Sequence, residues 1–237
     1  MQDPKVEVFD MTLKTPFNMI ISGSSQSGKT TKLVKLLKYK DIMLDATTKQ
    51  VIFFFSEWQD TYKTLKELKL VDKFYKGIPS QEELMLLLTD TGLKNFSENP
   101  HQLLIFDDLV SEIQDDLMSK LFTVYGHHKN VSIVLVTQAL FNPRVSKFNI
   151  LQQNVHYLLL FKSPRDNSKV IYLAKQISPY NIHWVVQAFQ DSTKKPYSYL
   201  FFSFKQACPE KLRLRTNIFP DEAPMKIYTN LSYAKTI

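Results

Sequence analysis

The sequence predicts an α/β fold, with a mostly parallel central sheet covered by helices on both faces. Short and almost continuously apolar segments alternate with amphipathic segments along the chain. Apolar segments of this kind are typical of strands that are buried on both faces, as in parallel sheets, and the amphipathic segments provide the crossover helices. With 237 residues, of which 44% are hydrophobic, the chain has the length and composition of one large globular domain.

The predicted strands share a short apolar run bounded by polar or turn-forming residues. They are residues 17–22, 49–57, 101–108, 131–138, 155–161 and 197–205. The predicted helices share apolar positions at helical spacing, as with Leu33, Leu36 and Leu37 in the first of them. They are residues 29–40, 61–70, 81–90, 113–128 and 165–177.

The chain divides by composition into three parts. We interpret residues 1–16 as an N-terminal extension, residues 17–208 as the core, and residues 209–237 as a C-terminal arm. The arm is less periodic than the core and mixes Pro, Lys and aromatic residues. It either wraps on the domain or forms a contact in an oligomer.

Several features indicate an intracellular protein without a membrane-spanning segment. The longest apolar runs are far shorter than the roughly 20 residues that a transmembrane helix needs. The first ten residues carry acids and lack the pattern of a secretory signal. Cys208 is the one cysteine, so the chain forms no internal disulfide and suits a reducing compartment.

The charge balance points to a polyanionic partner or to solubility. The formal net charge is +7 and the isoelectric point is about 9.2. Such a balance favours nucleic acid as a partner, although many proteins carry Lys only to stay soluble.

A phosphate-binding motif follows the first predicted strand. The sequence GSSQSGKT, residues 23–30, fits G-x-x-x-x-G-K-[ST] at every position, between a buried strand and an amphipathic helix. In this motif the loop amides face phosphate oxygens, Lys29 reaches the β- and γ-phosphates, and the Thr30 hydroxyl can ligate Mg²⁺. The predicted nucleotide-binding residues are Gly23, Ser24, Ser25, Gln26, Ser27, Gly28, Lys29, Thr30 and Thr31. A Gly- and Ser-rich turn is the plainer reading, but the strand and helix around the motif favour a P-loop NTPase.

Acidic and amide side chains end two later strands. Asp107 follows the apolar run of the third strand and is predicted to hold Mg²⁺, as the acid of a Walker B motif does. Asp108 either accepts the proton of the attacking water or simply ends the strand. Gln138 ends the next strand, where it would orient the water, report hydrolysis to the domain, or only terminate the strand. This order of motifs also points to the ASCE, RecA-like branch, which has an extra strand between the two motif strands.

Taken together, GSSQSGKT, LLIFDD and LVTQ resemble the motifs of the FtsK–HerA group of motor ATPases. The runs HHKNVSIVLVTQ, NVHYLLLFKSPRD and RTNIFPDE resemble viral genome-packaging ATPases of poxvirus-like large DNA viruses, virophages and Polinton- or adintovirus-like elements. The resemblance covers residues 17–220, which is most of the chain.

The resemblance implies an enzyme that hydrolyses ATP with Mg²⁺ and pulls double-stranded DNA, without sequence preference, into a preformed capsid. It also implies a homo-oligomeric ring, a hexamer or a pentamer, that works at the portal vertex of the capsid. The implied location is the infected host cell, in the nucleus or a cytoplasmic virus factory, with a further place in the virion.

A motor of this kind needs a cation from the neighbouring subunit to stabilise the γ-phosphate during hydrolysis. Four of the 30 basic residues are arginines, so the candidates are few. Arg165 is the leading candidate because the resemblance includes its segment, and Arg144 is the second. Arg213 and Arg215 lie in the arm and suit DNA contact or packing.

Other functions of a P-loop protein remain open at this stage. A small-molecule kinase usually has an arginine-rich lid, which this chain lacks, and a large terminase needs a nuclease domain for which 237 residues leave no room. A nucleotide-dependent switch or scaffold without translocation is the third alternative. The acids and the glutamine favour hydrolysis over a switch of this kind.

Overall fold

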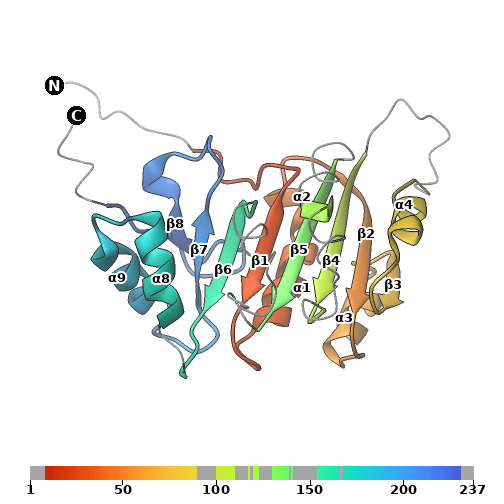
Figure 1. Cartoon of the computed structure of the whole chain (residues 1–237), viewed down its shortest axis with the longest axis horizontal. Coiled ribbons are helices and arrows are strands. Elements are labelled where there is room, and N and C mark those ends of the chain that lie inside the picture. Colours follow the sequence, from red (N-terminus) through yellow and green to blue (C-terminus); the bar gives the residue numbers. More distant parts are fainter. Residues whose placement is uncertain are drawn as a thin grey trace.

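A mixed sheet forms the centre of the computed structural model, which describes residues 9–89, 100–109, 117, 120–122, 130–138, 140, 154–165 and 168–230. In these residues the strands are β1 (Asn18–Ser22), β2 (Thr48–Phe55), β3 (Lys73–Lys76), β4 (His101–Asp107), β5 (Val131–Thr137), β6 (Tyr157–Phe161), β7 (Tyr199–Ser203), β8 (Leu214–Thr216) and β9 (Lys226–Ile227). They form one sheet in the order β3-β2-β4-β5-β1-β6-β7-β8-β9 (Figure 1).

The sheet is parallel from β3 through β6, and β7, β8 and β9 are added to it in antiparallel pairs. Strand β5 lies between β1 and β4, which is the extra-strand order predicted from the motifs. The predicted fold class, a mostly parallel α/β sheet flanked by helices, is therefore confirmed.

Helices cover both faces of this sheet. They are α1 (Lys29–Lys38), α2 (Lys40–Met43), α3 (Thr61–Glu67), α4 (Gln81–Thr89), α8 (Ser168–Ile177) and α9 (Ile182–Ser192), with a 3₁₀ turn at Glu210–Leu212. One buried cluster joins α1, α2 and α3 to the sheet, and a second joins α4, α8 and α9 to the opposite face. In Figure 1, α1 and α2 lie behind the sheet and α8 and α9 lie in front of it.

The hydrophobic pattern explains this two-sided burial. In β1, Ile20 packs in one cluster and Ile21 in the other, because successive side chains of a strand point to opposite faces. Helix α1 buries Leu33, Leu36 and Leu37 along one side. Full burial of each such side chain contributes roughly 1.5–3 kcal/mol.

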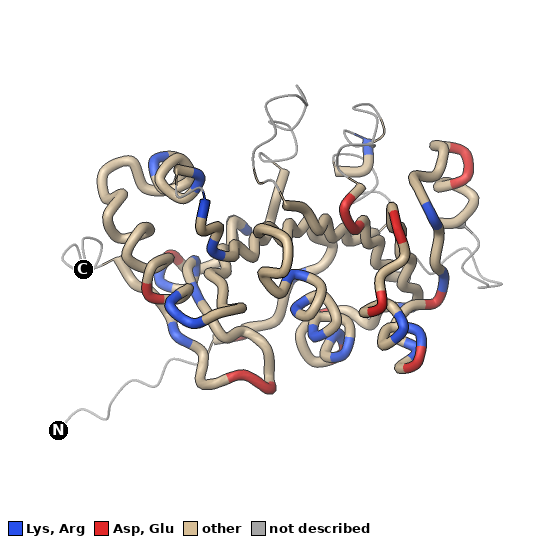
Figure 2. Tube along the Cα trace, turned by 90° about the horizontal axis from the view of Figure 1, so that it is seen from below, with Lys and Arg blue, Asp and Glu red and all other residues tan. Residues whose placement is uncertain are grey.

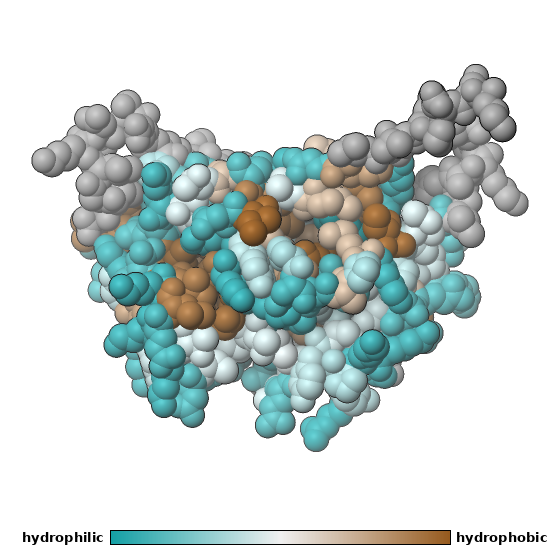
Figure 3. All heavy atoms as spheres, turned by 180° about the vertical axis from the view of Figure 1, so that it is seen from behind, coloured by the Kyte–Doolittle hydropathy of each residue, from teal (hydrophilic) through white to brown (hydrophobic). Residues whose placement is uncertain are grey.

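The face that carries α1 to α3 is mainly hydrophilic, with patches of hydrophobic residues between the polar ones (Figure 3). None of the described helices is both long and apolar enough to cross a bilayer.

The C-terminal residues add to the core sheet. Leu214–Thr216 pairs with β7 as β8, and Lys226–Ile227 pairs with β8 as β9. Phe219, between these two strands, is 3% exposed and packs in the buried cluster that joins α1, α2 and α3 to the sheet. This part of the arm is therefore wrapped on the domain.

Most of the predicted helix at 113–128 lies outside the described residues, although Leu117 and Lys120 are helical. The predictions missed β3, β8, β9, α2 and α9.

Candidate nucleotide-binding site

The candidate site lies where the parallel strands end. Ser22 at the end of β1 is level with Thr137 of β5, and Asp107 at the end of β4 is level with Val136. Open α/β sheets bind ligands beyond the carboxyl ends of their strands. Figure 2 looks at the molecule from this side.

The loop between β1 and α1 takes a path that requires its two glycines. Gly28 caps α1 with a φ of 98°, in the left-handed region that favours glycine. A Cβ built on Gly23 would lie 2.6 Å from Phe161 Cβ and 2.6 Å from Ser27 Oγ, which leaves no room for a side chain. The loop therefore curls tightly over the end of β1, as a phosphate cradle does.

Lys29 is the first residue of α1, and its ammonium group is held inside the loop. Its Nζ donates hydrogen bonds to the carbonyl oxygens of Gly23 and Ser24, at 2.8 and 2.9 Å. Burial lowers the pKa of Lys29, while the charges of Asp107 and Asp108 act in the opposite direction. A bound polyphosphate would stabilise the charged form of this ammonium further.

Ser27 contributes a second polar group to the loop. Its Oγ is buried and has no hydrogen-bond partner among the described residues. Buried polar atoms are normally paired, so an unpaired hydroxyl in a loop of this shape suggests that a ligand completes its bonding.

Asp107 is buried at the end of β4, and a side chain of α3 holds its carboxylate in place. The Tyr62 hydroxyl, from α3, donates to Asp107 Oδ2 at 2.8 Å. Burial raises the pKa of Asp107 to about 6, and the charge of Asp108 adds to the increase. The hydrogen bond from Tyr62 and the charge of Lys29 reduce it. A buried carboxylate with this pKa favours a bound cation as its partner.

Asp108 is exposed next to it and has a different setting. Its φ is 58°, a left-handed value that is uncommon for a residue other than glycine. Its backbone N–H donates to the carbonyl oxygen of Val136 at 3.1 Å. Gln138 Nε2 donates to Asp108 Oδ2 at 3.3 Å, so the ends of β4 and β5 are linked by their side chains.

The structure thus brings Lys29, Asp107, Asp108 and Gln138 together at the phosphate loop. Thr30 follows Lys29 in the first turn of α1. A hydroxyl and a carboxylate are oxygen ligands of the kind that Mg²⁺ takes beside nucleotide phosphates. The residues present therefore fit a nucleoside triphosphate with magnesium.

The arginines lie in different settings. Arg165 is exposed in the segment after β6, at the same edge of the sheet as the phosphate loop. Arg144 lies outside the described residues. Arg213 donates to Glu210, Ser203 and Lys205, and these bonds make it a packing residue.

Arg215, the other arginine of the arm, is 5% exposed. Its guanidinium lies 4.8 Å from the ring centre of Phe201. Its low exposure makes it an interior residue, and this burial lowers the pKa of Arg215.

Two side-chain groups of the site region were missed in the sequence. Tyr62 is one, because its contact with Asp107 joins residues 45 positions apart. The other is Glu222 of the run RTNIFPDE, which forms an ion pair with Lys32 of α1 and accepts a hydrogen bond from Tyr199 at 2.6 Å. The C-terminal arm is thereby fastened to the helix that begins at the phosphate loop.

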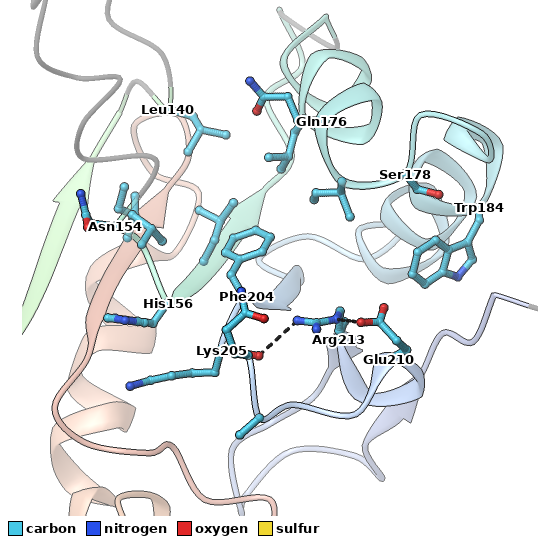
Figure 4. Close-up of a pocket in the computed structure, with 17 residues that line it drawn as sticks. Leu140, Asn154, His156, Gln176, Ser178, Trp184, Phe204, Lys205, Glu210 and Arg213 are labelled. Carbon is cyan, nitrogen blue, oxygen red and sulfur yellow. Dashed lines mark hydrogen bonds and ion pairs between the residues drawn. The ribbon is translucent and has the colours of Figure 1, made fainter. Parts of the chain in front are cut away.

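A large cavity of about 1110 Å³ lies elsewhere, on the α8 and α9 face. Figure 4 shows Trp184, Phe204 and Arg213 around it, with Arg213 bound to Glu210 and to the Lys205 carbonyl. None of its lining residues belongs to the phosphate loop, so the two sites are separate.

The family model described as Poxvirus A32 protein matches residues 8–200. This chain belongs to the poxvirus A32 protein family. The match spans the phosphate loop and the ends of β4 and β5, so Lys29, Asp107, Asp108 and Gln138 lie within the family region. The resemblance to poxvirus-like packaging ATPases is confirmed by this match.

Individual relatives come from poxviruses. The DNA packaging protein OPG160 of variola virus is 29% identical over 131 residues, which is 53% of this chain and 47% of that protein. The protein of the same name from vaccinia virus (strain Copenhagen) is 31% identical over 140 residues, again 53% and 47% of the two chains. The chain thus matches about half the length of these relatives.

Solved structures extend the likeness to the whole fold. The genome packaging NTPase B204 from Sulfolobus turreted icosahedral virus 2, in its complex with sulfate, has a TM-score of 0.53 and 14% identity. The comparison covers 90% of this chain and 96% of B204. The complex of B204 with AMPPCP gives a TM-score of 0.51. The A32-family chain and B204 share their fold.

Proposed function

We propose that this A32-family chain is an ATP-hydrolysing motor that moves viral double-stranded DNA into a preformed capsid. The observation that carries the proposal is the cluster of Lys29, Asp107, Asp108 and Gln138 around a glycine-built phosphate loop. The chain belongs to the A32 family, and its relatives are named DNA packaging proteins. Both facts support DNA movement as the work that hydrolysis drives.

The roles in hydrolysis follow from the chemistry of each side chain. Lys29 exchanges its bonds to the loop carbonyls for the β- and γ-phosphates of ATP. Thr30 and Asp107 would hold Mg²⁺, which neutralises charge on the phosphates when bound. Asp108, exposed beside the buried Asp107, is the base that accepts a proton from the attacking water.

Gln138 connects the site to the rest of the sheet. Its amide donates to Asp108 and its backbone follows β5, the strand between β1 and β4. A change in the charge or position of Asp108 during hydrolysis would therefore reach Gln138 directly. We assign it the role of orienting the water and reporting the state of the phosphate.

The partners follow from the same proposal. A net charge of +7 suits non-specific contacts with DNA phosphates, and Lys and Arg lie on both sides of the sheet in the view of Figure 2. We propose a ring of identical subunits, a hexamer or pentamer, docked at the portal vertex of the capsid. The ring works in the infected cell, in the nucleus or a cytoplasmic factory, and can accompany the virion.

ATP hydrolysis with and without double-stranded DNA tests the proposal. A motor should release phosphate from ATP, and DNA of any sequence should increase the rate of hydrolysis. This stimulation should decrease as the salt concentration rises, because salt weakens contacts with DNA phosphates. Asp108→Asn is the matched variant, since it keeps the size of the side chain and removes the base. It should bind ATP and lose most hydrolysis.

Other results would reject the motor. Phosphate transfer to a small acceptor would indicate a kinase. Turnover that stays very slow with DNA present would indicate a nucleotide switch. Electron microscopy with a non-hydrolysable ATP analogue and DNA should show rings around DNA, and persistent monomers would contradict the proposed assembly.

A further inference from the structure

Tyr197 is an exposed aromatic residue at the edge of the phosphate loop. A Cβ built on Gly28 would lie 3.3 Å from Tyr197 Cβ and 3.5 Å from its Cδ1, so the tyrosine packs on the glycine that caps α1. Its side chain is nevertheless 67% exposed. The ring thus stands beside the loop and leaves much of its surface open to a ligand.

The backbone holds this ring in an unusual conformation. The φ of Tyr197 is 63°, in the left-handed region that bulky residues seldom adopt. The turn is closed by a hydrogen bond from the Ser198 N–H to the Lys195 carbonyl at 3.3 Å. Strain of this type persists where the surrounding structure fixes it, and it concentrates at ligand sites.

The strand that follows provides a rigid support. Tyr199 begins β7, is 1% exposed and donates to Glu222 at 2.6 Å. The Lys32 ammonium of α1 lies 5.1 Å from the centre of the Tyr199 ring. Tyr197 comes two residues before this anchor, and its side chain packs at the start of the same helix.

The order of the strands places the acids and Tyr197 on opposite sides of the strand that leads into the phosphate loop. Asp107, Asp108 and Gln138 end β4 and β5, and they define the side of the loop where the terminal phosphate reacts. Strands β6 and β7 lie on the other side of β1. A nucleotide whose γ-phosphate faces the acids has room to extend its sugar and base away from them, toward β6 and β7, where Tyr197 stands.

We propose that Tyr197 is the platform on which the nucleobase stacks, an inference that rests on the proposed nucleotide function. Stacking uses the π-face that every base has, so it adds affinity without choosing among bases. Tyr197 therefore contributes to the binding of ATP and GTP alike, and it contributes nothing to the binding of a polyphosphate that has no base.

Calorimetric binding of ATP, GTP and inorganic tripolyphosphate to four proteins tests this role. The ring-deleting variant is Tyr197→Asn, because Asn tolerates a left-handed backbone and so removes the ring without added strain. Tyr197→Phe keeps the ring. Tyr180→Asn is the matched control, since Tyr180 is fully exposed in the turn between α8 and α9.

Without the stacking ring, Tyr197→Asn should bind ATP and GTP roughly 5- to 100-fold more weakly than the unmodified chain. Its affinity for tripolyphosphate should be unchanged. Tyr197→Phe and Tyr180→Asn should bind all three like the unmodified chain. Equal weakening of tripolyphosphate, or unchanged binding of ATP, would overturn the platform. If the unmodified chain binds neither ATP nor tripolyphosphate, the proposed nucleotide function fails first, and the platform with it.

Discussion

The Tyr62 hydroxyl donates a 2.8 Å hydrogen bond to Asp107 Oδ2, and this bond joins α3 to the acid at the tip of β4. Tyr62 is fully buried and Asp107 is 3% exposed, so water does not compete for either group. Burial and the nearby acids raise the pKa of Tyr62, which keeps its proton in place as a donor. Tyr62 is therefore a positioning residue for Asp107.

Replacing Tyr62 with Phe removes this donor and keeps the ring. A buried carboxylate oxygen then lacks a partner, which should lower the free energy of unfolding by roughly 1–3 kcal/mol. The bond lowers the pKa of Asp107, so its loss should move that pKa above its value of about 6. The acid limb of the pH profile for magnesium-dependent ATP hydrolysis should shift to higher pH.

Tyr180→Phe, at an exposed position, is the control for Tyr62→Phe. If Tyr62→Phe lowers stability and leaves the pH profile in place, the hydrogen bond is structural only.

Asp107→Asn should stabilise the protein in the absence of nucleotide and magnesium. The pKa of Asp107 is raised from 3.8 to about 6 by burial, so the folded state keeps its proton over a range where the unfolded state has lost it. Stability from this group is therefore full below about pH 4 and is lost as the pH rises through 6. The amide carries no charge and avoids this loss, which amounts to roughly 1–3 kcal/mol.

Urea unfolding at several pH values measures the effect of Asp107→Asn. The stability difference between the variant and the unmodified chain should grow between pH 4 and 7 and then level off. A constant difference across that range would mean that the Asp107 pKa is unshifted. Hydrolysis of ATP should be lost in the variant at every pH.

Glu222→Gln should loosen the C-terminal arm from the phosphate-loop helix. The side chains of Lys32 and Glu222 are 12% and 9% exposed, so removing one charge leaves the other buried and unpaired. We expect a loss of roughly 3 kcal/mol in unfolding free energy, measured by urea denaturation. Asp60→Asn is the control, because the Lys63–Asp60 pair is 63% and 90% exposed and should contribute below about 0.5 kcal/mol.

Gly23→Ala should disable the phosphate loop. Its Cβ would meet Phe161 Cβ and Ser27 Oγ at 2.6 Å, so the loop must move away from the end of β1. Nucleotide binding, measured by calorimetry, should weaken at least about tenfold, which corresponds to roughly 1.4 kcal/mol. Gly77→Ala separates crowding from backbone strain, since Gly77 has a φ of 82° with open space around it, and it should leave nucleotide binding unchanged.

Strands β1, β2, β4, β5 and β6 of the parallel part could be predicted from the sequence because each contains an almost continuous apolar run, whereas the parallel strand β3 combines polar and aromatic residues over four positions. The phosphate loop could be predicted because its glycines, lysine and threonine have a fixed spacing within eight residues. The acids could be predicted because they directly follow an apolar strand. The short strands β8 and β9, of three and two residues, carry no periodic signal and form only by pairing with β7. Helix α9 did carry a signal, with Val185, Ala188, Phe189 and Ser192 buried at helical spacing.

Contacts between distant segments could not be predicted. The bond from Tyr62 to Asp107 and the pairing of Lys32 with Glu222 depend on which helices lie next to which strand ends. A single sequence shows which residue types are present, but it does not show which distant residues come into contact. Tyr197 is a similar case, because only the fold places it beside Gly28.

Arg165→Ala should separate nucleotide binding from hydrolysis. Arg165 is exposed at the sheet edge that bears the phosphate loop. If it is the cation supplied between subunits, its loss should leave ATP affinity unchanged and reduce the oligomer-dependent rate by about 10³-fold. Arg165→Lys should restore little, since Lys lacks the planar fork of donors.

Mixed rings test whether Arg165 acts between subunits. Subunits with Arg165→Ala keep a complete phosphate site, and subunits with Asp108→Asn keep the arginine. Mixing these two inactive variants should restore part of the hydrolysis, because some Asp108 sites then face a neighbour that carries Arg165. Lys162→Ala, in the same exposed segment, is the matched control and should hydrolyse ATP normally. Full activity of Arg165→Ala alone would transfer the role to Arg144, and failure of the mixture would show that Arg165 serves its own subunit.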